Sequence, residues 1–198
     1  MPVLAITGGI ATGKSTFARR FQRLTDARLF DADAAAKGLL DGNPDVQEKV
    51  RAVFGPQVMD AGGGICRKRL REVVFNDDAR RRELEGILHP LIRAQWEDEA
   101  ARARKQEQWY LADIPLLYET GGDAHADYVA VVACSRETQI RRMREERGLA
   151  LPMAEAILHA QAPLDQKMNR ASFVIWTDSS QSFLDDQARL LAAYLSYG

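Results

Sequence analysis

Short apolar runs alternate along the chain with longer stretches in which apolar residues recur every three or four positions. The short runs predict strands at residues 3–7, 28–30, 109–114, 128–133 and 173–176. The longer stretches predict helices, including a closing helix from about residue 182. Because strands that alternate with helices form parallel sheets covered on both faces, the pattern predicts an α/β three-layer sandwich around a parallel five-stranded sheet.

Polar and special residues mark where some of these helices begin and end. Ser135 is expected to cap a helix at residues 139–147, and Gly148 is expected to end it. A proline in a helical stretch removes a hydrogen-bond donor and crowds the preceding turn. Pro90 is therefore predicted to break or kink the helical pattern around it.

The second and third predicted strands are separated by about eighty residues, too many for one crossover. Their pattern is helical and is interrupted by a glycine-rich stretch at residues 60–64. We therefore expect a helical insertion at about residues 40–107 that serves the substrate. The sequence contains no repeat or flexible linker, so residues 1–198 are expected to form a single domain with this insertion.

Residues 8–15 read G-G-I-A-T-G-K-S, the G-x-x-x-x-G-K-S pattern of a phosphate-binding loop (P-loop), directly after the first apolar run. In this pattern backbone N–H groups surround a polyphosphate, the lysine reaches the β- and γ-phosphates, and the hydroxyl residue ligates Mg²⁺. A P-loop NTPase fold is expected. The nucleotide-binding residues predicted here are Gly9, Ala11, Thr12, Gly13, Lys14, Ser15 and Thr16.

Carboxylates follow two of the predicted strands, where parallel sheets bind their ligands. Asp31 and Asp33 follow the strand at 28–30, and either can accept a proton from an acceptor hydroxyl. The alternative is that one of them caps the next helix. Asp113 lies where a Walker B acid would hold the Mg²⁺ shell, although an aspartate there can also cap a turn.

Composition restricts the class of partner. The 198 residues carry 27 basic and 28 acidic side chains, a net charge of −1, which argues against a general nucleic-acid or membrane-surface binder. A small-molecule partner is expected instead. With no membrane-length apolar run and no basic leader, the expected location is cytoplasmic. Cys66 and Cys134 lack metal-binding spacing and are assigned no chemistry.

Four motifs in this order and spacing resemble the dephospho-coenzyme A kinase family: T-G-G-I-A-T-G-K-S-T, D-A-D, His89-Pro90 and D-I-P-L-L-Y-E. The resemblance implies ATP-dependent phosphorylation of the ribose 3′-hydroxyl of dephospho-coenzyme A, the last step of coenzyme A synthesis. It implies that Asp33 is the base and Asp31 a supporting acid. Lys14 and the loop amides would stabilise charge on the transferring group, with Mg²⁺ bridging the phosphates.

The same resemblance suggests substrate contacts. Arg67, in a stretch similar to the family's G-x-x-R-x-x-L, is a candidate for pairing with a substrate phosphate, and the alternative is a solvated basic helix face. His89 is expected to hydrogen-bond the substrate, with a structural histidine as the alternative. Glu119, the last residue of D-I-P-L-L-Y-E, is expected at the substrate as well.

A kinase must exclude water from its site, so a helical lid is expected at about residues 141–170. Arg142 matches the arginine of the family's Q-x-x-R and is the catalytic candidate there. Where a second arginine is usual the chain has Glu146, which leaves Arg144 and Arg147 as alternative phosphate contacts. Thr177 stands where asparagine often follows the last strand.

Two other functions remain open from the residues alone. Another small P-loop kinase, acting on a nucleotide, shikimate or gluconate, would use the same loop. A regulatory or transport NTPase would couple the nucleotide to a conformational change without an acceptor. The chain has neither an N-K-x-D nor an L-S-G-G-Q signature, and the oligomeric state is not predicted.

Overall fold

The computed structural model describes residues 1–75 and 77–197. The described chain divides into two compact units. The first combines Met1–Phe30 with Glu99–Gly198, and the second is Asp31–Asp98.

Within the described residues, the strands form one five-stranded sheet of parallel strands in the order β2-β3-β1-β4-β5. Each predicted strand is confirmed to within a residue or two. Their bounds are β1 (Val3–Gly8), β2 (Arg28–Asp31), β3 (Tyr110–Asp113), β4 (Tyr128–Ala133) and β5 (Phe173–Trp176). Strand β1 lies in the middle of the sheet and is buried along its whole length, which explains why its sequence is apolar without alternation.

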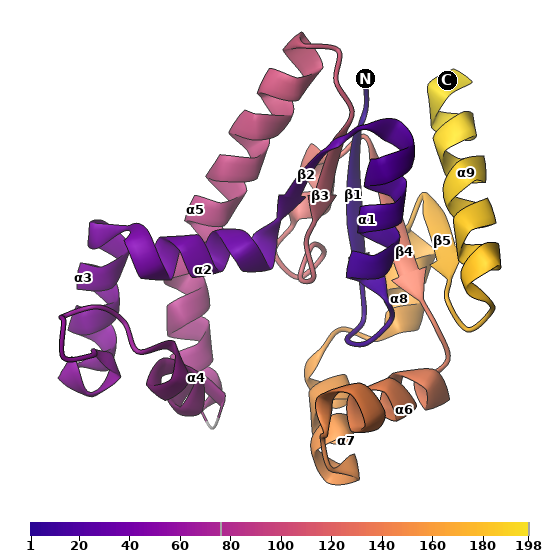
Figure 1. Cartoon of the computed structure of the whole chain (residues 1–198). Helices are drawn as coiled ribbons and strands as arrows, with labels where there is room; N and C mark the ends of the chain where they lie inside the picture. Colours follow the sequence, from indigo (N-terminus) through magenta and orange to yellow (C-terminus); the bar gives the residue numbers. More distant parts are fainter. Residues whose placement is uncertain (76, 198) are drawn as a thin grey trace. The chain divides into compact units, whose positions relative to one another are not determined.

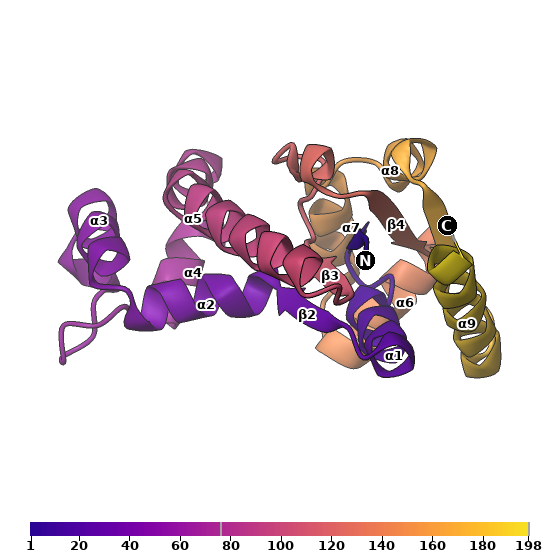
Figure 2. The same ribbon diagram turned by 90° about the horizontal axis from the view of Figure 1, so that it is seen from above.

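Helices cover both faces of this sheet. The helices α1 (Lys14–Thr25) and α9 (Gln181–Tyr197) lie on one face, and α8 (Leu164–Arg170) packs against β4 on the other (Figures 1 and 2). The predicted three-layer α/β sandwich is therefore confirmed. The short 3-10 helix η2 (Gly122–His125) precedes β4.

Two further helices, α6 (Arg136–Arg147) and α7 (Leu151–Ala160), connect β4 to α8. The predicted boundaries of α6 are confirmed by its caps. The Ser135 hydroxyl accepts a hydrogen bond from the Thr138 N–H at 3.2 Å, and Gly148 adopts a φ of 64° at the C-terminal end. The helix begins three residues earlier than its apolar pattern indicated.

Aromatic side chains between α1 and the sheet form the centre of the core. Phe21 lies 5.9 Å from Phe17 and 6.0 Å from Trp109, measured between ring centroids. Leu4 and Ile6 of β1 belong to the same buried cluster. Packing of this kind fixes the direction in which α1 leaves β1, and hence the position of the loop between them.

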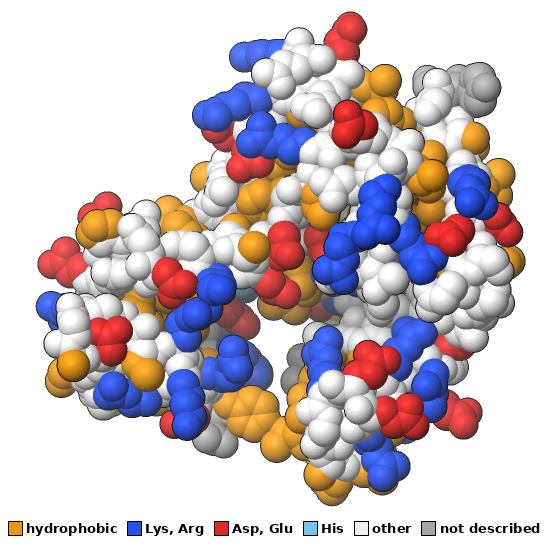
Figure 3. Space-filling view, in the orientation of Figure 1, with side chains coloured by type: hydrophobic (Ala, Val, Ile, Leu, Met, Phe, Trp, Pro, Cys, Tyr) orange, Lys and Arg blue, Asp and Glu red, His pale blue; other side chains and the backbone are white. Residues whose placement is uncertain are grey.

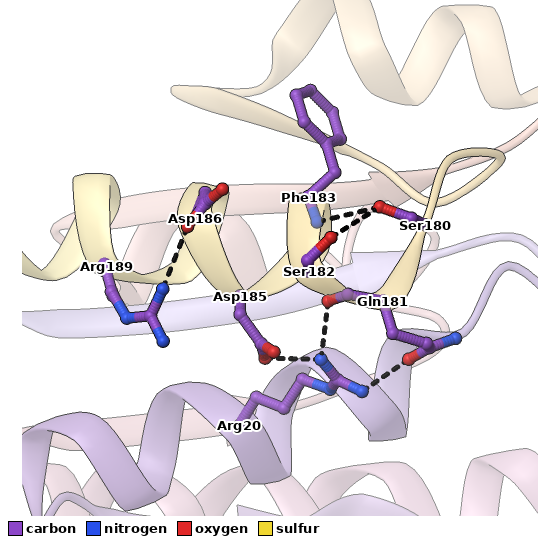
Figure 4. Close-up of polar contacts among 8 residues, drawn as sticks. All are labelled: Arg20, Ser180, Gln181, Ser182, Phe183, Asp185, Asp186 and Arg189. Atoms are coloured by element: carbon purple, nitrogen blue, oxygen red, sulfur yellow. Dashed lines mark hydrogen bonds and ion pairs between the residues drawn. The ribbon is translucent and has the colours of Figure 1, made fainter.

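A polar cluster joins α1 to the start of α9 (Figure 4). The Arg20 guanidinium donates a hydrogen bond to the Gln181 carbonyl oxygen at 2.9 Å and is also paired with the Asp185 carboxylate and the Gln181 side chain. The Phe183 side chain points away from this cluster and is exposed. Arg20 thus ties together two helices that are distant in sequence.

The second unit is helical. Its elements are α2 (Ala32–Gly42), α3 (Pro44–Phe54), the 3-10 helix η1 (Pro56–Val58), α4 (Arg67–Phe75) and most of α5 (Asp78–Lys105). Asn43 separates α2 from α3, and its side chain caps α3 by accepting the Val46 N–H at 3.1 Å. Buried apolar residues, among them Leu40, Val50 and Leu70, give this unit its own core.

Of the break or kink predicted at Pro90, the break is wrong. Helix α5 is continuous through Pro90, which is exposed. A proline removes only one backbone hydrogen bond. Leu88, Ile92 and Trp96 are buried at four-residue intervals on both sides of it, so packing outweighs the local loss. None of the helices in the described part of the chain combines the length and apolarity that a bilayer crossing requires.

We predict that Gly8→Ala destabilises the protein by about 2 kcal/mol, because a Cβ at Gly8 would lie 2.4 Å from the Val132 carbonyl oxygen. The matched control is Gly38→Ala, where no atom lies within 4 Å of the new Cβ and the helix gains up to about 1 kcal/mol. Urea unfolding followed by circular dichroism measures both. Unchanged stability of Gly8→Ala would mean that β1 and β4 lie farther apart than this contact between Gly8 and Val132 requires.

Candidate active site

The P-loop connects the buried end of β1 to the first turn of α1. Gly13 precedes that turn with a φ of 89°, and Ala11 has a φ of 58°, unusual for a residue with a Cβ. Thr12 is fully buried, and its hydroxyl donates to the Gly9 carbonyl oxygen at 2.9 Å. The loop therefore has the left-handed turns that direct successive N–H groups toward an anion, next to the positive end of a helix.

The start of α1 meets the carboxylate at the end of β3. Asp113 is 3% exposed, and its side chain forms an ion pair with the Lys14 ammonium. The Ser15 hydroxyl donates to the other oxygen of the same carboxylate at 3.3 Å. The register Ile6↔Asp113 between β1 and β3 brings these groups together. The structure thus joins three residues that the sequence predicted for phosphate and metal binding.

These groups also fit a magnesium ion by their chemistry. A hydroxyl and a carboxylate are the hard oxygen ligands that Mg²⁺ prefers, and Mg²⁺ needs few protein ligands because it keeps several waters. No cluster of three or more histidine, cysteine or acidic side chains suitable for a metal is found in residues 1–75 and 77–197.

A buried lysine, which the sequence analysis missed, supports the segment after β3. Lys167 on α8 is 1% exposed, and its ammonium lies 2.7 Å from the Glu119 carboxylate. It also donates to the Pro115 carbonyl oxygen at 3.2 Å, which accepts the Thr7 hydroxyl at 3.1 Å as well. Glu119, predicted to contact substrate, is thus the counter-charge of Lys167. No spacing along the sequence marks this long-range pair.

Arg142 of α6 is bonded to the protein itself. One guanidinium nitrogen donates to the Ala11 carbonyl oxygen at 3.1 Å and to the Thr177 hydroxyl at 3.1 Å, and the other donates to the Thr177 carbonyl oxygen at 2.8 Å. Arg144 and Arg147 are exposed on the same helix. Cys134 lies beside Thr177, and burial raises the pKa of its thiol to about 11, so it is protonated and unreactive at neutral pH.

The two acids of D-A-D differ in their environment within the second unit. Asp31 is the N-cap of α2, and its carboxylate accepts the Ala34 N–H at 3.0 Å. The capping alternative therefore holds for Asp31. Asp33 lies in the first turn of α2, is exposed, and forms no hydrogen bond or ion pair with the described residues. Its carboxylate is available to a ligand.

Arg67 and His89 also lie in the second unit. Arg67 is at the start of α4, with its Nε 3.3 Å from an Asp41 carboxylate oxygen, and both side chains are about half exposed. Basic side chains gather over α4, and acidic and basic side chains are mixed over α3 (Figure 3). His89 is half-buried. Burial lowers the pKa of its imidazole, assisted by Arg93 and opposed by Glu85, so it is neutral at pH 7.

Comparison with known proteins assigns the family. The dephospho-CoA kinase family model matches residues 2–182. The chain belongs to the dephospho-CoA kinase family. It is 39% identical over 199 residues to a dephospho-CoA kinase from Anaeromyxobacter dehalogenans, covering 100% of this chain and 94% of the relative.

Solved structures agree with this assignment. The dephospho-CoA kinase from Campylobacter jejuni superposes with a TM-score of 0.68 at 25% identity, covering 100% of this chain and 98% of that one. The protein TT1252 from Thermus thermophilus has a TM-score of 0.80 at 29% identity, covering 98% and 97%. The resemblance seen in the motifs is thus confirmed over the whole chain, and the regulatory-NTPase alternative is set aside.

We predict that Lys167→Met lowers the free energy of unfolding by about 3 kcal/mol, because it leaves the Glu119 carboxylate without its buried counter-charge. The double variant Lys167→Met with Glu119→Gln should lose less than the single variant. Arg189→Met, which breaks an exposed pair with Asp186, is the control and should change stability by less than about 1 kcal/mol. Additive effects at 167 and 119 in urea unfolding would contradict a coupled pair.

Proposed function

We propose that this protein transfers the γ-phosphoryl group of ATP to the ribose 3′-hydroxyl of dephospho-coenzyme A, giving coenzyme A and ADP. The observation that carries the proposal is the convergence of Lys14, Ser15 and Asp113 at the P-loop. A cationic side chain, a hydroxyl and a buried carboxylate at a helix N-terminus are the groups that hold a nucleoside triphosphate. Membership of the dephospho-CoA kinase family identifies the acceptor.

In this proposal the protein contributes charge and position. The N–H groups of the loop and the Lys14 ammonium bind the phosphate oxygens and stabilise the charge that spreads over them during transfer. Ser15 and Asp113 are the residues proposed to hold Mg²⁺, which would supply positive charge to the phosphate oxygens when bound with ATP. The Thr16 hydroxyl, next to Ser15 and exposed, is proposed as a further nucleotide contact.

Asp33 is the proposed general base. An exposed carboxylate that has no partner among the described residues can accept the proton that the 3′-hydroxyl loses as it attacks phosphorus. Asp31 is proposed to support it by fixing the first turn of α2, because its side chain bonds the Ala34 N–H.

The second unit is proposed to bind the acceptor. Arg67 would exchange its exposed Asp41 partner for a substrate phosphate, and neutral His89 would hydrogen-bond the substrate. We also propose that a helical insertion at about residues 40–107 carries these contacts and that residues 141–170 act as a lid. Glu119 is proposed to reach the substrate from its pair with Lys167.

The test is ADP release from Mg²⁺-ATP with a series of acceptors: dephospho-coenzyme A, AMP, adenosine, shikimate and gluconate. Release stimulated only by dephospho-coenzyme A, with product mass showing one added phosphate, is the expected result. Stimulation by a different acceptor would replace the substrate and keep the kinase mechanism. ADP release that is independent of any acceptor would overturn the proposal.

We predict that Asp33→Asn lowers kcat by about 100-fold or more, the usual scale of general acid–base catalysis, while the Kd for ATP stays unchanged. Asp45→Asn is a matched control, because Asp45 is also an exposed acid in the first turn of a helix. Steady-state kinetics and calorimetric ATP titration measure the two quantities. An Asp33→Asn enzyme with the parent kcat would remove Asp33 from the role of base.

A further inference from the structure

Backbone groups of the P-loop are bonded from outside by side chains that are far away in sequence. The Gln139 amide donates to the Ile10 carbonyl oxygen at 2.7 Å, and the Gln161 amide oxygen accepts the Ile10 N–H at 2.9 Å. Arg142 donates to the Ala11 carbonyl oxygen at 3.1 Å. The Thr177 hydroxyl donates to the Thr12 carbonyl oxygen at 2.6 Å.

These contacts converge from three segments of the first unit. Gln139 and Arg142 lie on α6, Gln161 follows α7, and Thr177 follows β5. Gln139 and Thr177 are 5% and 6% exposed. Their hydrogen bonds to the loop offset the free-energy cost of burying these polar side chains. There is also no spare room, since a Cβ at Gly9 would lie 2.7 Å from the Gln139 amide nitrogen.

The bonded carbonyl groups determine where the loop N–H groups point. In a trans peptide the carbonyl of one residue and the N–H of the next point in opposite directions. The carbonyl groups of Ile10, Ala11 and Thr12 accept hydrogen bonds from Gln139, Arg142 and Thr177, in that order. The N–H groups of Ala11 and Gly13 therefore face the opposite, ligand side of the loop, while the Thr12 N–H donates to the Gly9 carbonyl oxygen at 3.4 Å.

The strained conformation of Ala11 is held by the same contacts. A left-handed φ of 58° at a residue with a Cβ persists only where the surroundings determine it. Hydrogen bonds to the carbonyl groups of Ile10 and Ala11 fix the peptide on each side of this residue. Without them, the loop would have other conformations available before the ligand arrives.

We propose that Gln139, Arg142, Gln161 and Thr177 form a loop clamp: positioning residues that hold the P-loop in its polyphosphate-binding conformation in the absence of nucleotide. This proposal rests on the proposed function only in taking a nucleoside polyphosphate as the ligand. Pre-organisation increases affinity because the loop is already ordered, so its conformational entropy is not lost when the ligand binds. Arg142 acts on the ligand through the Ala11 carbonyl group and Thr177, and not as a direct phosphate contact.

The two glutamines provide a sharp test, because they bond the same residue with opposite polarity. Gln139 donates and Gln161 accepts. Replacement by methionine removes either bond, and we expect the Kd for ATP and for inorganic tripolyphosphate to rise about 10-fold in each case. Glutamate retains an acceptor but lacks a donor. Gln161→Glu should therefore bind ATP at least about 5-fold more tightly than Gln139→Glu, although both add the same charge beside Ile10.

Gln187→Met is the matched control. Gln187 also bonds a backbone residue through both ends of its amide, accepting the Trp176 N–H at 2.9 Å and donating to the Trp176 carbonyl oxygen at 2.8 Å. It does so on the exposed side of β5, so its loss should leave the Kd for ATP unchanged. Calorimetric titration without acceptor makes these measurements independent of whether dephospho-coenzyme A is the substrate.

A second pair of variants covers the case in which a glutamine variant does not fold. Thr177→Val removes the hydroxyl that bonds Thr12, and Thr177→Ser restores it. We expect valine to raise the KM for ATP about 10-fold without raising that for dephospho-coenzyme A, and serine to reverse the effect. Equal ATP affinity of Gln161→Glu and Gln139→Glu, or of Thr177→Val and Thr177→Ser, would overturn the proposal.

Discussion

Strand β1 is hydrogen-bonded to β3 on one side and β4 on the other, and the register of those pairings decides which residues meet at the carboxyl end of the sheet. Ile6 lies opposite Asp113, so the chain that leaves β1 passes the Asp113 carboxylate as it enters α1. Gly8 lies opposite Val132 in a contact that leaves no room for a side chain. A shift of one residue in the register between β1 and β3 would separate Lys14 from its buried counter-charge.

The buried charges near this edge are compensated in pairs. The Asp113 carboxylate is bonded by Lys14 and Ser15, and the Lys167 ammonium is bonded by Glu119 and the Pro115 carbonyl oxygen. An unpaired ion at these depths would cost several kcal/mol, of order 3 to 5. The conformation of the D-I-P-L-L-Y-E segment, which carries Asp113, thus depends on its contacts with Lys167 of α8. This accounts for the presence in one motif of an acid that faces the P-loop and an acid that balances a buried lysine.

The proposed loop clamp changes the interpretation of the segment between β4 and α9. Residues 139–142 resemble a family motif whose arginine was expected to contact phosphate. In this structure the same segment bonds the outer side of the P-loop through Gln139 and Arg142. A lid that opens by moving α6 would have to break these bonds, so lid position and the conformation of the loop would be coupled.

Local signals in the sequence were sufficient to predict the strands, the caps of α6 and the phosphate-binding loop, because each depends on residues that are only a few positions apart along the chain. The identity of the family was also readable from the ordered motifs. The continuity of α5 through Pro90 was not, since buried contacts at Leu88, Ile92 and Trp96 decide it. Neither was the partner of Lys167, nor the contacts of Gln139, Gln161 and Thr177 with the loop, which join residues 129 to 165 positions apart. Such contacts depend on how the strands are ordered in the sheet, and no short-range periodicity along the chain records that order.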